Sequence, residues 1–144
     1  MPTLTITRGL PGSGKTTWAK DQPGVRVNRD GLRAMLLPAP WPHGDEGAED
    51  ACSIAQHWAI RGLLRAGYDV VCDDTNLLQE HVTSLHELVE DLDDVVVATR
   101  SEFLQVPIET CIARDALRPE GERVGEGRIR AMWERHLDDL ACIA

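Results

Sequence analysis

The chain has 144 residues, of which 42% are hydrophobic and 27% are charged, values near the averages of globular domains. Fifteen lysines and arginines stand against 24 acidic residues, which gives a formal net charge of −9. This balance argues against a protein that coats nucleic acid non-specifically, because such proteins carry a basic surface.

Cysteine spacing and hydropathy suggest the compartment. None of the four cysteines lies in a C-x-x-C pair, so a zinc site is not expected, and a reduced setting is the simplest inference. The chain has no N-terminal secretory core and no apolar run of the roughly 18–20 residues needed to cross a bilayer. We therefore expect one cytoplasmic domain over residues 1–144, with no membrane contact.

The first predicted elements are a strand, a glycine-rich loop and a helix. Residues 4–7 alternate apolar and polar side chains, as a strand does. Residues 9–16 read G-L-P-G-S-G-K-T and fit the Walker A pattern G-x-x-x-x-G-K-S/T without a mismatch. The segment after Thr16 can begin a helix that ends before Pro23.

Each position of this loop has a mechanical role. Glycines let successive backbone N–H groups face a phosphate, and the helix that follows favours an anion at its start. Lys15 supplies a charge for the β- and γ-phosphates, and the hydroxyl of Thr16 can ligate Mg²⁺ or Mn²⁺. We therefore expect ATP or another NTP to bind at Gly12, Ser13, Gly14, Lys15, Thr16 and Thr17.

The remaining predicted elements alternate between strand and helix. They are a strand at 25–28, helices at 29–37 and 46–66, a strand at 68–72, a helix at 79–92, a strand from 95, and helices at 108–117 and 129–140. A proline-rich loop at 38–44 contains Trp41, either a base-stacking residue or a loop anchor, and the glycines within 119–127 predict a mobile segment. This alternation predicts an α/β fold whose parallel sheet gathers ligands at the carboxyl ends of its strands.

Polar residues follow the second predicted strand. Asp30 is a candidate general base, because phosphoryl transfer to an alcohol needs a carboxylate to accept the hydroxyl proton. The alternative is that Asp30 caps the following helix. Arg33, three residues later, shares its helical face, which suits either a common pocket or a simple surface ion pair.

Two further clusters follow later strands. Asp74 resembles the strand-end acid that reaches the Mg²⁺ shell through a water molecule. Asp73 is the competing choice, on the opposite face of the strand. Arg114 and Arg118 share a helix face and suit a lid over the phosphates at about residues 114–128, although either could be a solvated surface arginine.

Five sequence blocks in this order carry a family resemblance: G-L-P-G-S-G-K-T-T-W-A, N-R-D-G-L-R, D-D-T-N-L, V-P-I-E-T-C-I-A-R-D-A-L-R and R-A-M-W. Over nearly the whole chain, they resemble the 5′-kinase domain of bacteriophage polynucleotide kinase, in the P-loop kinase superfamily. The resemblance implies a three-layer α/β/α fold with a four- to five-stranded parallel sheet and a helical lid. It also implies transfer of the γ-phosphate of an NTP to the 5′-hydroxyl end of DNA or RNA.

The resemblance also implies roles for single residues. Lys15 and Thr16 would hold phosphate and magnesium, and Asp30 would be the base. Arg33 would contact the phosphate on the 3′ side of the accepting nucleoside. The strand-end acid would be Asp74, the lid arginine Arg118, and a second arginine of that helix Arg114.

Two features depart from that family, and two other functions stay open. The chain ends too early for a C-terminal phosphatase domain, so we expect no phosphatase activity, and residues 119–127 are unusually rich in glycine and acids. A kinase of another hydroxyl, on a hydroxymethylated DNA base, a nucleoside or a sugar, is the second hypothesis. A nucleotide-binding module without catalysis is the third. The sequence leaves open the choice between DNA and RNA, and whether the chain forms a homo-oligomer.

Overall fold

The computed structural model describes residues 1–37 and 46–143, and the predicted loop around Trp41 lies outside these ranges. None of the helices in the described ranges has the length and apolar character that crossing a membrane would require. The strands are β1 (Thr3–Thr7), β2 (Val25–Val27), β3 (Val70–Cys72) and β4 (Val96–Arg100). The helices are α1 (Lys15–Lys20), α2 (Arg29–Leu36), α3 (Glu46–Arg65), α4 (Gln79–Val89), η1 (Glu102–Gln105), α5 (Ile108–Ala116), η2 (Glu120–Glu122) and α6 (Glu126–Ile143).

The four strands form one parallel sheet in the order β2-β3-β1-β4. The central strand β1 pairs Leu4 with Val70 of β3 and Thr3 with Val96 of β4. Every residue of β3 is buried, as expected for a V-V-C run inside a parallel sheet. The predicted α/β class with a four- to five-stranded parallel sheet is therefore confirmed.

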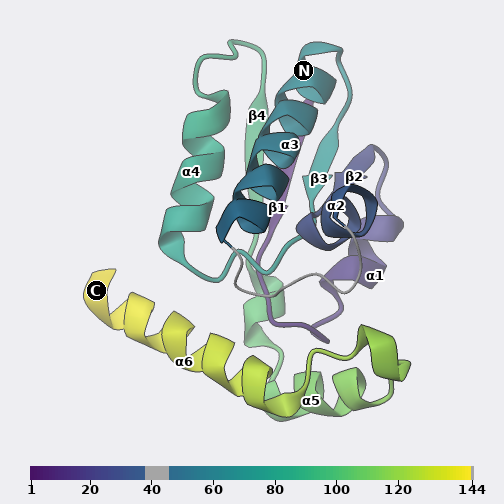
Figure 1. Ribbon diagram of the computed structural model, residues 1–144. Helices are drawn as coiled ribbons and strands as arrows, with labels where there is room; N and C mark the ends of the chain where they lie inside the picture. Colours follow the sequence, from purple (N-terminus) through teal and green to yellow (C-terminus); the bar gives the residue numbers. More distant parts are fainter. Residues whose placement is uncertain (38–45, 144) are drawn as a thin grey trace.

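Helices α3 and α4 lie side by side over one face of the sheet (Figure 1). Their apolar side chains pack against alternate residues of the strands in the main core, formed by Leu4, Ile6, Val27, Ile60, Leu64, Val70, Cys72, Val82, Leu85 and Val89. Helix α1 is placed on the opposite face. The connection from β1 to β2 crosses the sheet in one direction, whereas those from β2 to β3 and from β3 to β4 cross it in the other, and all three crossovers are expected to be right-handed. Strand β4 lies at the edge of the sheet, and its first residue, Val96, is accordingly 44% exposed.

A second core lies below the carboxyl ends of the strands, where α5 and the start of α6 pack together (Figure 1). Its buried members are Leu10, Leu77, Cys111 and Ile129. They join the glycine loop, the β3–α4 connection, α5 and α6 in one cluster. This core fixes α5 and α6 against the edge of the sheet at which parallel α/β folds bind ligands.

The end of the segment predicted as mobile is hydrogen-bonded to α5. The Asp115 carboxylate is 2% exposed and accepts hydrogen bonds from the backbone N–H groups of Val124, at 3.0 Å, and Gly125, at 2.9 Å. Helix α6 therefore begins at Glu126 and runs to Ile143, longer at both ends than its predicted range. The reason is a contact across nine to ten residues, which local glycine content does not reveal.

Helix α6 is also tied to the start of α4. The residue before α4, Leu78, offers no side-chain cap, and the carboxylate of Asp139 accepts the backbone N–H of Gln79 at 2.9 Å instead. About one helical turn earlier in α6, Nδ1 of the buried His136 lies 2.9 Å from the carbonyl oxygen of Leu77. These two contacts hold the β3–α4 connection in place against the sheet edge.

Asp139→Ala should lower the free energy of unfolding by about 1 kcal/mol, because the first turn of α4 loses its capping acceptor. The measurement is urea unfolding followed by circular dichroism. The matched control is Asp138→Ala, which removes an exposed carboxylate from the adjacent position of α6. Equal midpoints for the two variants would contradict a capping role for Asp139.

Candidate functional site

The glycine loop has a conformation that only glycine adopts readily. Gly12 and Gly14 have φ angles of +84° and +94°. A Cβ atom on Gly12 would lie 2.4 Å from the carbonyl oxygen of Cys111 in α5. The loop is thus packed directly on α5, and this close approach explains why a side chain is excluded there.

Lys15 is almost buried at the end of this loop, with 7% of its surface exposed. Its Nζ donates a hydrogen bond to the carbonyl oxygen of Leu10 at 3.2 Å. Burial lowers the pKa of Lys15, and the nearby carboxylate of Asp73 opposes this shift. A largely dehydrated ammonium group held by a neutral carbonyl is well suited to bind an anion, so this observation fits a phosphate group.

Thr16 and Asp73 form an oxygen-rich pair beside Lys15. The Thr16 hydroxyl donates a hydrogen bond to Oδ1 of Asp73 at 3.3 Å, and Oδ2 of Asp73 pairs with Arg26 at 3.2 Å. Burial raises the pKa of the fully enclosed Asp73 carboxyl, against the effects of Lys15 and Thr16. A hydroxyl and a carboxylate are the hard oxygen donors that Mg²⁺ prefers, so these residues fit the expected metal.

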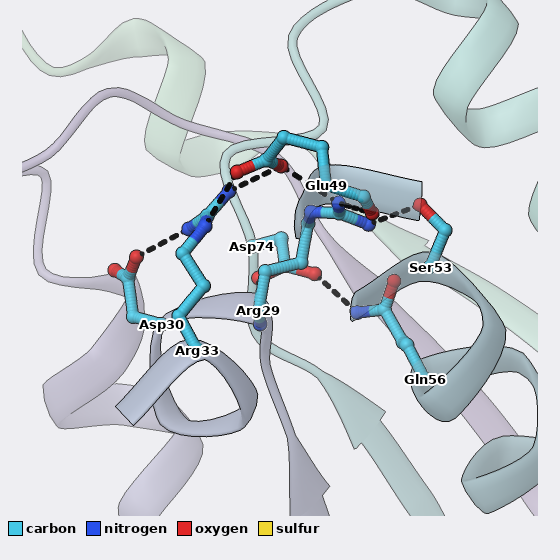
Figure 2. Close-up of polar contacts among 7 residues, drawn as sticks. All are labelled: Arg29, Asp30, Arg33, Glu49, Ser53, Gln56 and Asp74. Atoms are coloured by element: carbon cyan, nitrogen blue, oxygen red, sulfur yellow. Dashed lines mark hydrogen bonds and ion pairs between the residues drawn. The ribbon is translucent and has the colours of Figure 1, made fainter. Parts of the chain in front are cut away.

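Asp74 lines the same pocket, but its carboxylate is hydrogen-bonded to two helices, α2 and α3 (Figure 2). Its Oδ1 accepts the backbone N–H of Arg29 at 2.9 Å, and its Oδ2 accepts the side-chain amide of Gln56. The geometry therefore favours Asp73 over Asp74 as the acid next to Thr16. The reason is the alternation of side chains beyond β3, which sends consecutive residues to opposite sides.

Asp30 and Arg33 lie on the first two turns of α2. The Asp30 side chain is 95% exposed, and its Oδ1 accepts a hydrogen bond from Nη1 of Arg33 at 2.8 Å. The helix is capped by Asn28, whose side chain accepts the backbone N–H of Gly31 at 2.6 Å, so Asp30 is not the cap. Asp30 and Arg33 line the same pocket of about 550 Å³ as Lys15 and Thr16.

Glu49 of α3 pairs with two arginines of this pocket and was not among the site residues expected from the sequence. Its carboxylate accepts two hydrogen bonds from Arg33, at 2.8 Å and 2.7 Å, and a third from Arg29 at 2.8 Å (Figure 2). The Arg33 guanidinium and the Arg29 hydrogen bond lower the pKa of Glu49 to about 2. Glu49 therefore stays ionised and joins α3 to α2.

Of the other predicted nucleotide-binding residues, Arg118 lines the pocket, Arg114 contacts the glycine loop, and Thr17 lies outside the pocket. Nη1 of Arg114 donates to the carbonyl oxygen of Gly12 at 3.2 Å, and Arg118 lines the pocket while pairing with Asp115 at 3.5 Å. The backbone N–H of Ser13 already donates to Leu10, and its buried hydroxyl has no partner in the described part of the chain. Thr17 is exposed and is not among the residues that line the pocket.

A second cavity, of about 520 Å³, adjoins this pocket. Arg29, Arg33 and Asp74 line both spaces, so the two meet at the start of α2. Burial lowers the pKa values of His57 and His81, which lie in the wall of the second cavity, and so favours their neutral forms. A neutral imidazole offers one hydrogen-bond donor and one acceptor.

Glu49→Gln should change how stability depends on pH. The pKa of Glu49 falls from 4.5 to about 2 on folding, so its ionised form stabilises the fold above pH 4.5, and that contribution is lost as the pH falls towards 2. We expect the variant to be less stable than the wild type at pH 7, with the difference shrinking between pH 4.5 and pH 2. Urea unfolding over this pH range measures the difference. A gap that stays constant down to pH 2 would contradict the ion pairs.

Comparison with known proteins gives one family and related folds. The family model described as an AAA domain matches residues 4–139. The L-seryl-tRNA(Sec) kinase of Methanococcus maripaludis is 25% identical over 136 residues, which cover 92% of this chain and 51% of that protein. The chain therefore spans about half the length of this curated relative.

Two solved structures share the fold. A chain in the structure of the Pnkp1/Rnl/Hen1 RNA repair complex aligns with a TM-score of 0.77 and 22% identity, covering 97% of this chain and 45% of that one. A chain of the Pnkp1/Rnl/Hen1 complex aligns with a TM-score of 0.64 and 25% identity, covering 78% and 39%. These matches confirm the predicted P-loop kinase fold. Since the family model covers nearly all of its residues, the chain belongs to the AAA domain family.

Proposed function

We propose that the chain transfers the γ-phosphate of ATP or another NTP to the 5′-hydroxyl end of DNA or RNA. One observation carries the proposal: the carboxylate of Asp30 and the guanidinium of Arg33 line the same pocket as Lys15 and Thr16. A donor site and an acceptor site for phosphoryl transfer therefore share one space. The similarity in fold to chains of the Pnkp1/Rnl/Hen1 assemblies supports a nucleic-acid acceptor.

Asp30 is the proposed general base. Its exposed carboxylate can orient the acceptor hydroxyl and take its proton as the new P–O bond forms and the bond to the bridging β–γ oxygen breaks. The products are the phosphorylated 5′ end and the nucleoside diphosphate, and the proton passes from Asp30 to solvent. Capping is already provided by Asn28, so this carboxylate is available for such a role.

The donor phosphates are assigned to the glycine loop, Lys15 and the lid arginines. Thr16 and Asp73 are proposed to hold Mg²⁺, which when bound would neutralise charge on the β- and γ-phosphate oxygens. Arg118 lines the pocket and is the proposed lid arginine, and Arg114 steadies the loop through the Gly12 carbonyl. Asp74 is proposed to hold the start of α2, and thereby Asp30, through the backbone N–H of Arg29.

Arg33 is the proposed contact to the phosphate on the 3′ side of the accepting nucleoside. A guanidinium has five N–H donors, and Arg33 uses three of them on Glu49 and Asp30. Two donors are left for a phosphate without releasing Glu49. The ion pairs then fix the guanidinium plane before the acceptor arrives, which reduces the entropy lost on binding.

The relative from Methanococcus maripaludis favours a second candidate acceptor, the L-seryl group of a charged tRNA. A panel with γ-labelled ATP and Mg²⁺ tests both. It contains 5′-hydroxyl DNA and RNA oligonucleotides, the same oligonucleotides with a 5′-phosphate, seryl-tRNA, a nucleoside, DNA with a hydroxymethylated base and a sugar. We expect label only on the 5′-hydroxyl oligonucleotides. ATP hydrolysis without their labelling would overturn the proposed substrate.

Asp30→Asn should lower kcat for phosphoryl transfer by about 10²- to 10⁴-fold, the usual contribution of a general base. Binding of a fluorescent ATP analogue should be unchanged, because Asp30 lies on the acceptor side of the pocket. Asp93→Asn, an exposed acid in the connection between α4 and β4, is the control and should keep full activity. A kcat within threefold of the wild type in Asp30→Asn would refute its role as base.

Asp73→Asn and Asp74→Asn form a pair that separates the two acids. We expect Asp73→Asn to raise the Mg²⁺ concentration needed for half-maximal activity by about tenfold or more, since metal sites lose 10- to 100-fold affinity even on loss of outer-shell partners. Asp74→Asn should leave this concentration unchanged, because Asp74 contacts Arg29 and Gln56. The titration is of transfer rate against free Mg²⁺. The reverse order of effects would return the metal role to Asp74.

A further inference from the structure

The cavity beside the phosphate pocket is larger than a single phosphate needs. Its volume of about 520 Å³ lies within the range of small-molecule sites. It opens from the pocket at Arg29 and Arg33, the acceptor-side arginines, and extends between α3, α4 and α6. A strand whose first phosphate is held by Arg33 would therefore continue into this cavity.

On the side of the cavity formed by α6, the guanidinium of Arg135 has no paired acid among the described residues. Arg135 of α6 lines the cavity and makes no hydrogen bond or ion pair with the residues in ranges 1–37 and 46–143. Three arginines, Arg29, Arg33 and Arg135, line the cavity with two acids, Glu49 and Asp74. Glu49 is paired with Arg29 and Arg33, and Asp74 accepts hydrogen bonds from neutral donors only. Arg135 thus leaves an unbalanced positive charge facing the space.

The rest of the lining suits a nucleotide better than a bare anion. His57 and His81 offer hydrogen-bond donors and acceptors from α3 and α4. Leu78 and Met132, both half-buried, add apolar surface against which a base can lie. One cation, neutral polar groups and an apolar patch in the same cavity match the parts of a nucleotide: phosphodiester, sugar and base.

We propose that this cavity holds the second nucleotide of the acceptor strand, with Arg135 contacting the phosphodiester on its 3′ side. The inference rests on the proposed function and narrows its substrate class. The acceptor is an oligonucleotide with at least two phosphodiester links after its 5′-hydroxyl, and a nucleoside 3′-monophosphate fills only the Arg33 end. The chain then recognises a short length of strand as well as its end.

Arg135→Ala tests the inference, with Arg65→Ala as control because Arg65 is an exposed arginine of α3 that does not line the cavity. We expect Arg135→Ala to raise KM for a 5′-hydroxyl tetranucleotide about tenfold with kcat unchanged, the loss of one phosphate contact. KM for a nucleoside 3′-monophosphate should not change. The control should match the wild type on both substrates.

A binding measurement makes the test independent of turnover. Fluorescence anisotropy of a labelled 5′-hydroxyl tetranucleotide, titrated at several salt concentrations, gives the slope of log K against log salt. Losing one phosphate contact to a single strand should reduce this slope by about 0.7. We expect this reduction in Arg135→Ala and not in Arg65→Ala.

Two failures can be told apart. An unchanged salt slope and unchanged KM for the tetranucleotide in Arg135→Ala, with the wild type still labelling 5′ ends, would overturn the second-nucleotide site and leave the proposed function intact. Equal rises of KM for the tetranucleotide and the monophosphate would also overturn it. Absence of labelling of both substrates by the wild type, with ATP hydrolysed, would overturn the proposed function itself.

Discussion

The buried charge of Lys15 is the constraint on which the site depends. Removing an ammonium group from water costs several kcal/mol unless an opposite charge is close by. The fold places Asp73 near it, yet Nζ makes its hydrogen bond to a backbone carbonyl. The loop packs on α5 at Gly12, and Arg114 of the same helix donates a hydrogen bond to the Gly12 carbonyl. The folded chain therefore presents a largely dehydrated cation whose hydrogen bond goes to a neutral carbonyl, with the carboxylates of Asp73, Asp74 and Asp30 near enough to offset part of the cost of burial.

The adjacent acids Asp73 and Asp74, which follow β3, make contacts on opposite sides of the chain. Asp73 turns towards Thr16 and Lys15, and Asp74 turns towards Arg29 and Gln56. Consecutive side chains of a strand point to opposite sides. Asp73 therefore lies beside Thr16 and Lys15, while Asp74 connects α2 to α3. The position of α2, and with it Asp30, is thereby linked to the same strand that supports the proposed metal site.

The parts of the fold that the sequence predicted are those with local signatures. The glycine loop, the apolar strands and the amphipathic helices each follow from a short window, and the spacing of Asp30 and Arg33 placed them on one face of α2. Glu49, Asp115 and Asp139 could not be found this way. Each acts on a group nine to sixty residues distant, through contacts that exist only once the helices pack. The choice between Asp73 and Asp74 likewise depended on the direction of the chain after β3.

Net charge and local charge have different consequences in this molecule. The chain carries a formal charge of −9, which disfavours long-range attraction of a polyanion. Salt screens exposed charges beyond roughly 8 Å, so an arginine in a cavity acts on a ligand within that distance regardless of distant acids. Arg33 and Arg135 line such a space. Under the proposed function, a surface of this kind would attract the first few nucleotides of a strand and bind the rest weakly, so that each end could be released after one transfer.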